Sequence, residues 1–468
     1  MGAEFFILMK SEWSLMLIIF ILLFIKVVGN TKDNTQLLWI TNILLALNFV
    51  FGFFFNASGE LYNGMFHSNS LLALQKNILN FGTLIISFQA YQWLKGHKHL
   101  AEYYILLLTT LLGMFFMISS GNFLMFYLGL ELAAIPLAAL VNFDLDKLKS
   151  SEAAMKMILL SAFASGIMLF GISLVYGTTG TISFAELPAL LTGTHLQILA
   201  LVFVFVGFAF KLSAVPFHFW TADVYEGAPV SITAYLSVVS KASIVFVFIS
   251  VLYSLFVHVS ALWYNLQFLV IMLTILVGNL FALRQNNLKR FLAFSSIAQV
   301  GYILLGISSG TSMGFASAIF FLLIYTFSNL GVFGVVSLIA DETGKEDIND
   351  LKGFYKNNKT LGWVLTISLF SLAGIPPTAG FFGKMFLVTA GASNGNYILI
   401  TLAVLNMVVS LYYYIRIVKA VFIDPNDDPI KTLQTNGFMK ISLLLCVAGI
   451  VICGFTSGLF DYILALCN

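Results

Sequence analysis

Four ionisable side chains lie well inside long apolar segments of this sequence: Glu131, Lys211, Lys241 and Lys384. Removal from water disfavours the charged form of an ammonium group, whereas a nearby carboxylate favours it, so one acid among three lysines can exchange protons. A central ionisable residue costs about 2.5 to 3.5 kcal/mol on membrane-insertion scales. The four residues therefore predict a buried proton pathway. The alternative is that these charges only fix the packing of the helices.

Three further lysines lie inside apolar segments but within a turn or two of a segment end: Lys76, Lys156 and Lys440. A long lysine side chain near a helix end can extend its ammonium group to the lipid headgroups. We therefore set these three aside. Lys289 and Arg290, at the start of the tenth segment, are interpreted as loop anchors.

Prolines interrupt three of the apolar segments. A proline has no amide hydrogen, so the carbonyl four residues earlier loses its helical donor. The prolines and the carbonyls that they free are Pro136 with Leu132, Pro216 with Leu212, and Pro376 with Leu372. The first two carbonyls lie next to Glu131 and Lys211. Unpaired backbone at membrane depth requires protein or water to satisfy it, so we expect polar surroundings at these positions.

Two other features mark irregular helices near the lysines. Ser237 and Ser240 precede Lys241 and can support a bend or hydrate the amine. The segment SLAGIPPTAGFFGKM, ahead of and including Lys384, predicts an unwound centre in the twelfth span. KLSAVPF (211–217) aligns with SLAGIPP (371–377), which places Lys211 opposite Ser371. Broken helices at matching positions in two halves are typical of transporters built from inverted repeats.

The composition assigns the chain to membrane proteins. It has 468 residues, of which 60% are hydrophobic and 9% charged, against about 25% charged in soluble domains. About fourteen apolar stretches are long enough to cross a hydrocarbon core as helices. They are continuous rather than alternating, which argues against a barrel. We predict an all-α polytopic membrane protein, and the absence of a basic patch with interleaved aromatics excludes nucleic acid as a partner.

The loop charges and the cysteines add two expectations. Lys and Arg concentrate in the loops after odd-numbered segments, so the positive-inside rule places these loops in the cytoplasm and both termini on the outer, periplasmic side. Asp223 and Glu226 are expected at the outer end of the seventh helix, as solvated or capping residues. The three cysteines cannot assemble an iron–sulfur site from this chain alone, and we predict no metal or cofactor bound by it.

Three stretches carry a family resemblance: FKLSAVPFHFWTADVYEGAPVSITAYLSVVSKAS (210–243), RQNNLKRFLAFSSIAQVGY (284–302) and SLAGIPPTAGFFGKMF (371–386). Together they closely resemble the antiporter-like subunits of proton-translocating NADH–quinone oxidoreductase, respiratory complex I. DVYEGAP, the lysine at position 384 and the end soon after the fourteenth span favour subunit N (subunit 2) over its siblings M and L.

The resemblance implies roles for particular residues. The family's proton-relay positions match Glu131, Lys211, Lys241 and Lys384, and the histidine of its PFH motif matches His218. His218 either bridges the lysines through water or caps the broken backbone. In the family the glutamate pairs with the seventh-helix lysine, and we expect that pair to act as the switch of proton transfer.

The resemblance also implies a domain organisation. Residues 1–100 form an N-terminal three-helix segment, and 101–256 form the first antiporter-like repeat, with helices 4 to 8. Residues 257–423 form the second, inverted five-helix repeat, with helices 9 to 13, and 424–468 contain helix 14. The broken helices are the seventh and the twelfth.

The expected function is proton translocation in the bacterial inner membrane, as a translocase subunit without a redox site of its own. NADH, FMN, iron–sulfur clusters and quinone are expected in partner subunits, with subunits K and M as neighbours in the bilayer. A subunit of a multi-subunit Mrp-type Na⁺/H⁺ antiporter is the alternative. A solute carrier should offer a wider range of polar groups, and a structural scaffold should tolerate loss of all four charges.

Overall fold

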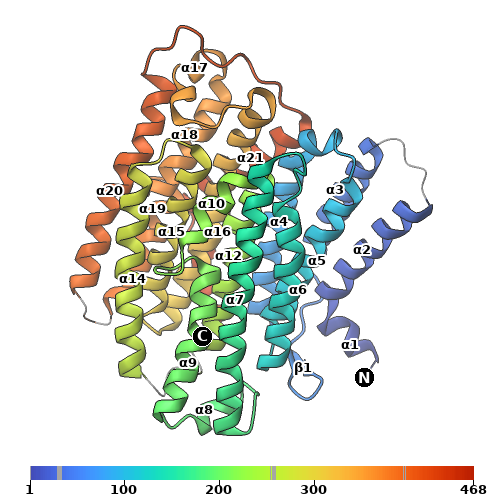
Figure 1. The fold of residues 1–468 in the computed structure, drawn as a ribbon, viewed down its shortest axis with the longest axis vertical. Helices are drawn as coiled ribbons and strands as arrows, with labels where there is room; N and C mark the ends of the chain where they lie inside the picture. The colour runs from blue at the N-terminus through green and yellow to red at the C-terminus, as the bar shows by residue number, and fades with distance from the viewer. Residues whose placement is uncertain (1, 29–33, 253–254, 256–259, 394, 396) are drawn as a thin grey trace.

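The computed structural model describes residues 2–28, 34–252, 255, 260–393, 395 and 397–468, and it is a bundle of helices (Figure 1). Within these ranges thirteen segments are long and apolar enough to cross a membrane. The pair α18 (Lys359–Ala373) and α19 (Ala379–Ala392), each too short alone, supplies one further, interrupted span. The predicted all-α polytopic fold is thus confirmed.

The elements follow one another in chain order. The first are α1 (Gly2–Leu8), α2 (Lys10–Val28), α3 (Asn34–Phe51), the strands β1 (Gly59–Leu61) and β2 (Phe66–Ser68) of one antiparallel hairpin, and α4 (Ser70–Lys95). Next come α5 (Leu100–Ile118), α6 (Phe123–Val141), α7 (Leu148–Thr179), α8 (Leu187–Leu190), α9 (His195–Leu212), α10 (Phe219–Gly227), α11 (Val230–Tyr235), η1 (Leu236–Ser240), α12 (Lys241–Val247) and η2 (Phe248–Leu252). The remainder, besides α18 and α19, are α14 (Ser260–Leu283), α15 (Leu288–Ile307), α16 (Ser312–Thr343), η4 (Ile348–Leu351), α17 (Phe354–Asn357), α20 (Tyr397–Phe422), α21 (Gly437–Phe455) and α22 (Gly458–Cys467).

The core of the bundle consists of α4, α15, α16 and the segment Val230–Val251 that α11, η1, α12 and η2 form. These spans are almost entirely buried, whereas α2, α3, α7 and α20 expose much of their surface. A helix that is apolar all round belongs in an interior of this kind. Polar residues on the core helices are therefore enclosed by protein, and they include Lys241.

Two helix breaks share one geometry. α9 and α18 each end on a residue in the left-handed conformation, Ser213 (φ 62°) and Gly374 (φ 85°). A glycine adopts that conformation without a Cβ clash. The next amide in each break donates to a carbonyl five positions earlier, Ala214 to Ala209 and Ile375 to Phe370. Both helix ends are therefore closed by the chain itself before the second half-helix begins.

This geometry corrects the predicted alignment of the two breaks by one residue. Ser213 corresponds to Gly374, so Lys211 lies opposite Leu372 rather than Ser371. In Figure 1 the chain rises from α9 to α10 through the first break and descends from α18 to α19 through the second. The chain thus passes the two breaks in opposite directions.

Lys241 follows an irregular turn, as the serines before it indicate. Leu236–Ser240 is a π-helical turn, and regular α-helix resumes at Lys241. Single π-turns inside α-helices occur frequently at functional sites.

The structure corrects the interpretation of Lys76. Its side chain is 3% exposed, and its Nζ lies 2.6 Å from Oε1 of Glu12 on α2, which is fully buried. The rings of Phe66 and Phe115 lie 5.2 and 5.8 Å from the ammonium group. Lys76 does not extend to the headgroups because a carboxylate and two aromatic faces take the place of water.

Breaking this buried pair should be costly, whereas removing both charges should not be. We expect Glu12→Leu to destabilise the chain by about 3 to 5 kcal/mol, because it leaves a buried ammonium without a partner, and Glu12→Leu/Lys76→Met to restore most of the loss. Thermal unfolding in detergent measures both.

The matched control is Glu102→Leu, which breaks the half-exposed pair of Glu102 with Lys26. It should cost no more than about 1 kcal/mol. Equal losses of stability in Glu12→Leu and in Glu12→Leu/Lys76→Met would show that the unpaired Lys76 ammonium is not the cause.

Candidate functional site

The first part of the site lies where α6, α7 and α9 meet. α5 and α6 approach each other closely at this level, since a Cβ on Gly113 would lie only 2.5 Å from the Ala133 amide. Lys211, at the end of α9, donates from Nζ to the Ser161 hydroxyl of α7 at 2.6 Å. Oε1 of Glu131 on α6 is buried without a hydrogen-bond partner, and its charge acts on the Lys211 ammonium. Glu131 and Lys211 are thus neighbours that interact through space, with Ser161 as the direct partner of the lysine.

A small cavity adjoins Lys211. Its volume is about 30 Å³, and its lining includes Ser161 on α7 together with Ser240 and Ser243, which flank Lys241 in the chain. A polar cavity of about 10 to 15 Å³ suffices for one water molecule. Water in this cavity would therefore connect Lys211 with the backbone turn that carries Lys241.

Lys241 lies in the core and has neutral partners. Its Nζ donates to the Ser296 hydroxyl of α15 at 2.6 Å and lies 5.6 Å from the centre of the Tyr225 ring. Ser237, one turn earlier, shares a hydrogen bond of 2.9 Å with the Tyr325 hydroxyl. A hydroxyl both donates and accepts, so these groups can take part in proton transfer in either direction.

A series of buried polar contacts continues toward the second break. Ser295 and Tyr414 share a hydrogen bond of 2.5 Å between their hydroxyls, and Nε2 of Gln299 donates to Tyr414 at 3.1 Å. The same Nε2 donates to the Leu372 carbonyl at 3.3 Å. This is the carbonyl that Pro376 deprives of its helical donor, and Gln299 from another helix supplies a replacement.

Lys384 completes the series on the far side of that break. Its side chain is 2% exposed, and its Nζ donates to the Ala373 carbonyl at the end of α18 at 3.2 Å. The Tyr302 ring lies 5.2 Å from the ammonium group. Ser371 accepts from the Gly380 amide at 3.2 Å and so joins the two half-helices. The structure therefore encloses Lys384 in polar backbone, as the glycines and prolines before it predict.

His218 lies in the first break, directly before α10. It is 6% exposed, and its Nδ1 has no hydrogen-bond partner. The cavity beside Lys211 has no contact with His218 among its lining residues. The histidine is close to the lysine in the chain without sharing its cavity.

Asp223 and Glu226 are ion-paired, rather than simply solvated or capping residues as expected. Arg290 lies 2.8 Å from both carboxylates, and Lys149 and Lys156 pair with Glu226 and Asp223 at 3.0 and 2.6 Å. The acids therefore lie at the basic end of the bundle, because α10 leads from the break toward that end. Arg290 is their common partner rather than a plain loop anchor.

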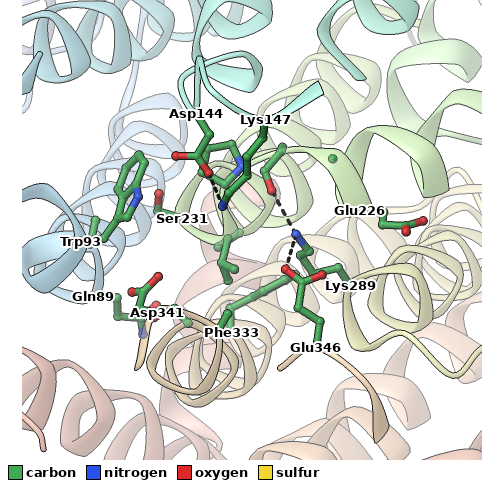
Figure 2. A pocket seen from close by; sticks show the side chains of 18 of the residues that line it. Gln89, Trp93, Asp144, Lys147, Glu226, Ser231, Lys289, Phe333, Asp341 and Glu346 are labelled. Atoms are coloured by element: carbon green, nitrogen blue, oxygen red, sulfur yellow. Dashed lines mark hydrogen bonds and ion pairs between the residues drawn. The ribbon is translucent and has the colours of Figure 1, made fainter. Parts of the chain in front are cut away.

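A polar vestibule of about 400 Å³ opens at this basic end (Figure 2). Lys289, whose side chain is 6% exposed, pairs with Glu346 at 2.8 Å and donates to the Ala228 carbonyl at 3.4 Å. Asp144 and Lys147 pair at 2.8 Å on the opposite wall. α10 contributes Glu226 to this polar vestibule and the Tyr225 ring to the surroundings of Lys241, so one half-helix joins the two sites.

The charge of Lys147 on the vestibule wall is favoured by its partner Asp144. Burial disfavours the Lys147 ammonium, but the hydrogen bond and the charge of Asp144 outweigh that effect and raise the pKa of Lys147 above its ordinary value. The spacing of residues in the sequence contains no signal for this vestibule, because its walls come from α4, α7, α10, α11, α15, α16 and three loops. One local signal nearby is the density of charged residues in 341–359.

Comparison with known proteins identifies the family. Residues 120–410 match the family described as NADH:quinone oxidoreductase/Mrp antiporter, TM. NADH-quinone oxidoreductase subunit N of Phocaeicola vulgatus is 52% identical over 406 residues, which is 86% of this chain and 86% of that protein. The chain belongs to the subunit N family of NADH-quinone oxidoreductases. Glu131, Lys211, Lys241 and Lys384 all lie in the matched range.

Solved structures agree with this assignment. A chain of respiratory complex I from Thermus thermophilus with bound aureothin is 28% identical, with a TM-score of 0.81 over 96% of this chain and 97% of that chain. A chain of the Mrp complex from Dietzia sp. is 20% identical, with a TM-score of 0.79 over 98% and 100%. The second likeness shows a common fold with subunit N and no more. Among the described residues, no group of three or more His, Cys, Asp or Glu could hold a metal ion.

The contact between Gln299 and the broken helix can be tested directly. We expect Gln299→Leu to lower the stability of the chain by about 1 to 3 kcal/mol, because the buried Leu372 carbonyl loses its donor. Thermal unfolding in detergent measures the change.

Gln285→Leu is the control, since Gln285 is a half-buried loop residue whose side chain bonds only to the Phe281 carbonyl of its own turn. It should change stability by no more than about 0.5 kcal/mol. A Gln299 variant as stable as the control would show that the freed carbonyl has another donor.

Proposed function

We propose that this chain is a proton-translocating membrane subunit of NADH-quinone oxidoreductase and that protons pass along Glu131, Lys211, Lys241 and Lys384. The observation that carries the proposal is a set of buried polar contacts across the core, from the cavity beside Lys211, through the Lys241–Ser296 and Gln299–Leu372 contacts, to the carbonyl that holds Lys384. Membership of the subunit N family and the name of the relatives support it.

Glu131 acts as the switch in this scheme. Its charge favours the protonated form of Lys211, so a shift of the carboxylate away from Lys211 removes that support and frees a proton. Water in the small cavity takes the proton toward Ser240 and Lys241. Moving one charge against about 100 mV costs roughly 2.3 kcal/mol, a demand that modest changes in the interaction of Glu131 with Lys211 can meet.

The proton continues from Lys241 through Ser296 and then through Ser295, Tyr414 and intervening water to Lys384. The hydroxyls of this route can donate and accept in turn. Lys384 lies beyond the second break, on the half-helix that leads away from the basic end (Figure 1). It is therefore the last ionisable residue before release at the opposite face.

Uptake is assigned to the polar vestibule at the basic end. The positive-inside rule makes this the cytoplasmic face of a bacterial inner membrane, with both chain termini outside. Lys289 and Glu346 hold charge beside the opening, and Tyr225 leads from α10 to Lys241. His218 serves as a cap of the broken backbone or as a water-linked relay beside Pro216.

Partner subunits supply the driving reaction. NADH, FMN, iron–sulfur clusters and quinone are assigned to them, and subunits K and M are the proposed neighbours in the bilayer. Residues 101–256 and 257–423 are proposed as the two inverted repeats, which the opposite directions of the chain at the two breaks support.

The alternative of an Mrp-type antiporter subunit has weaker support. The Mrp chain shares the fold at 20% identity, while relatives such as that of Pelagibacter ubique, at 36% over 92% of this chain, are named NADH-quinone oxidoreductase subunit N. Gene neighbours that encode quinone-site and cluster proteins would distinguish the two.

The role of Lys241 has a direct test. Lys241→Met in the assembled complex should lower the rate of quinone-coupled proton pumping by about tenfold or more, since a positioned proton-transfer group contributes about 10² to 10⁴ in rate. Pumping is measured in sealed vesicles with a pH-sensitive dye, after assembly is confirmed by native electrophoresis.

The control is Lys419→Met, which removes a 59% exposed ammonium far from the core. It should leave pumping unchanged. Normal assembly with undiminished pumping in Lys241→Met would overturn the relay.

The switch role of Glu131 predicts a different effect. Glu131→Gln keeps the size of the side chain and removes its charge, so it should reduce the protons pumped per NADH oxidised more than it reduces quinone reduction. Both rates are measured in the same vesicles. Glu102→Gln, at a half-exposed carboxylate, is the control. An unchanged ratio in Glu131→Gln would remove this residue from the mechanism.

A further inference from the structure

A groove of about 550 Å³ lies between α18 and α21 at the basic end of the bundle. Its apolar walls are Trp363, Val364 and Ile367 on α18, and Leu443, Leu444 and Val447 on α21. Trp363 and Leu444 are 52% and 70% exposed. The groove is therefore an open apolar surface on the outside of a membrane protein, away from the proton route.

The polar end of the groove is cationic. Lys359 and Lys440, both exposed, lie at this end together with Thr432 and Thr435. The lining residues, all of which the structure describes, include no Asp or Glu. Two ammonium groups without an acidic neighbour in the lining favour an anion between them.

α18 and α21 carry the same order of groups along the chain, a lysine first and apolar side chains after it. Trp363 and Ile367 follow Lys359 at one and two turns of α18, and Leu444 and Val447 follow Lys440 on α21. Residues three or four apart share one face of a helix. Each wall thus carries a charge at the membrane surface and apolar side chains below it, which is also the order of groups in a phospholipid.

Hydrogen bonds of Asn358 hold the polar end of the groove in place. Asn358, at the start of α18, donates to the Ile430 and Lys431 carbonyls at 3.3 and 3.0 Å and accepts from the Leu433 amide at 2.9 Å. These bonds fix the loop that carries Thr432 and Thr435 over the groove. Both lysines also lie in the first turn of their helices, where a cation opposes the helix dipole and a nearby anion would offset that cost.

We propose that this groove binds an anionic phospholipid. The phosphate lies between Lys359 and Lys440, and an acyl chain lies along Trp363, Ile367 and Leu444. Basic pockets between transmembrane helices are a recognised form of lipid-headgroup site. The occupant is a lipid because the charged end continues directly into an open apolar groove of membrane depth.

The experiment compares two charge-matched double variants in the assembled complex, purified in mild detergent. Lys359→Gln/Lys440→Gln should lose one tightly retained anionic phospholipid per complex, counted by quantitative lipid mass spectrometry. Lys356→Gln/Lys431→Gln removes two exposed lysines at the same end that do not line the groove, and it should lose none. Equal counts in the two double variants would overturn the proposal.

A second measurement tests the nature of the occupant. After delipidation, phosphatidylglycerol should restore the retained lipid in the unmodified complex, and phosphatidylcholine should not. Equal retention of both lipids would show that the lysines do not select an anion. Leu444→Cys with a thiol-reactive photocrosslinker should capture lipid, and capture of a protein subunit instead would show that a neighbouring chain fills the groove.

Discussion

The exclusion of water from charged side chains is the constraint on which the rest of this structure depends. Lys76, Lys241 and Lys384 are each no more than 3% exposed. The fold offsets the free-energy cost of burying these ammonium groups in two ways. Lys76 has a carboxylate at 2.6 Å, whereas Lys241 and Lys384 have only a hydroxyl or a carbonyl and an aromatic ring. A buried ion pair gives the ammonium group an opposite charge, while neutral partners give it only dipoles. The two kinds of surroundings therefore separate a structural lysine from those assigned to the relay.

The irregular helical segments of the bundle lie beside the lysines that have neutral partners. The breaks after α9 and α18 and the π-helical turn before Lys241 each expose backbone or place hydroxyls beside an amine. Regular helix could not do this, because its carbonyls are already engaged. The buried spans around these irregular turns hold them in place, so the same helices supply both rigidity and a polar interior.

The sequence allowed prediction of whatever depends on neighbours in the chain. Glu131 and the three lysines stand out because each is a lone charge in an apolar run, and the free Leu372 carbonyl follows from the chemistry of Pro376. Its partner Gln299 could not be predicted, because it comes from another helix. Lys76 was misinterpreted for the same reason: its distance from a helix end is a local property, and its pairing with Glu12 is not. The walls of the vestibule come from six helices and three loops, so this site shows most clearly what local sequence patterns cannot predict.

The carbonyl that holds Lys384 has a consequence for the chemistry of the amine. The C-terminal end of a helix presents unpaired carbonyls and a partial negative charge. Such an end attracts a cation as a carboxylate does, but it has no proton-binding state at any pH at which the protein works. The helix terminus therefore acts as a counter-ion to the Lys384 ammonium group without competing with it for a proton.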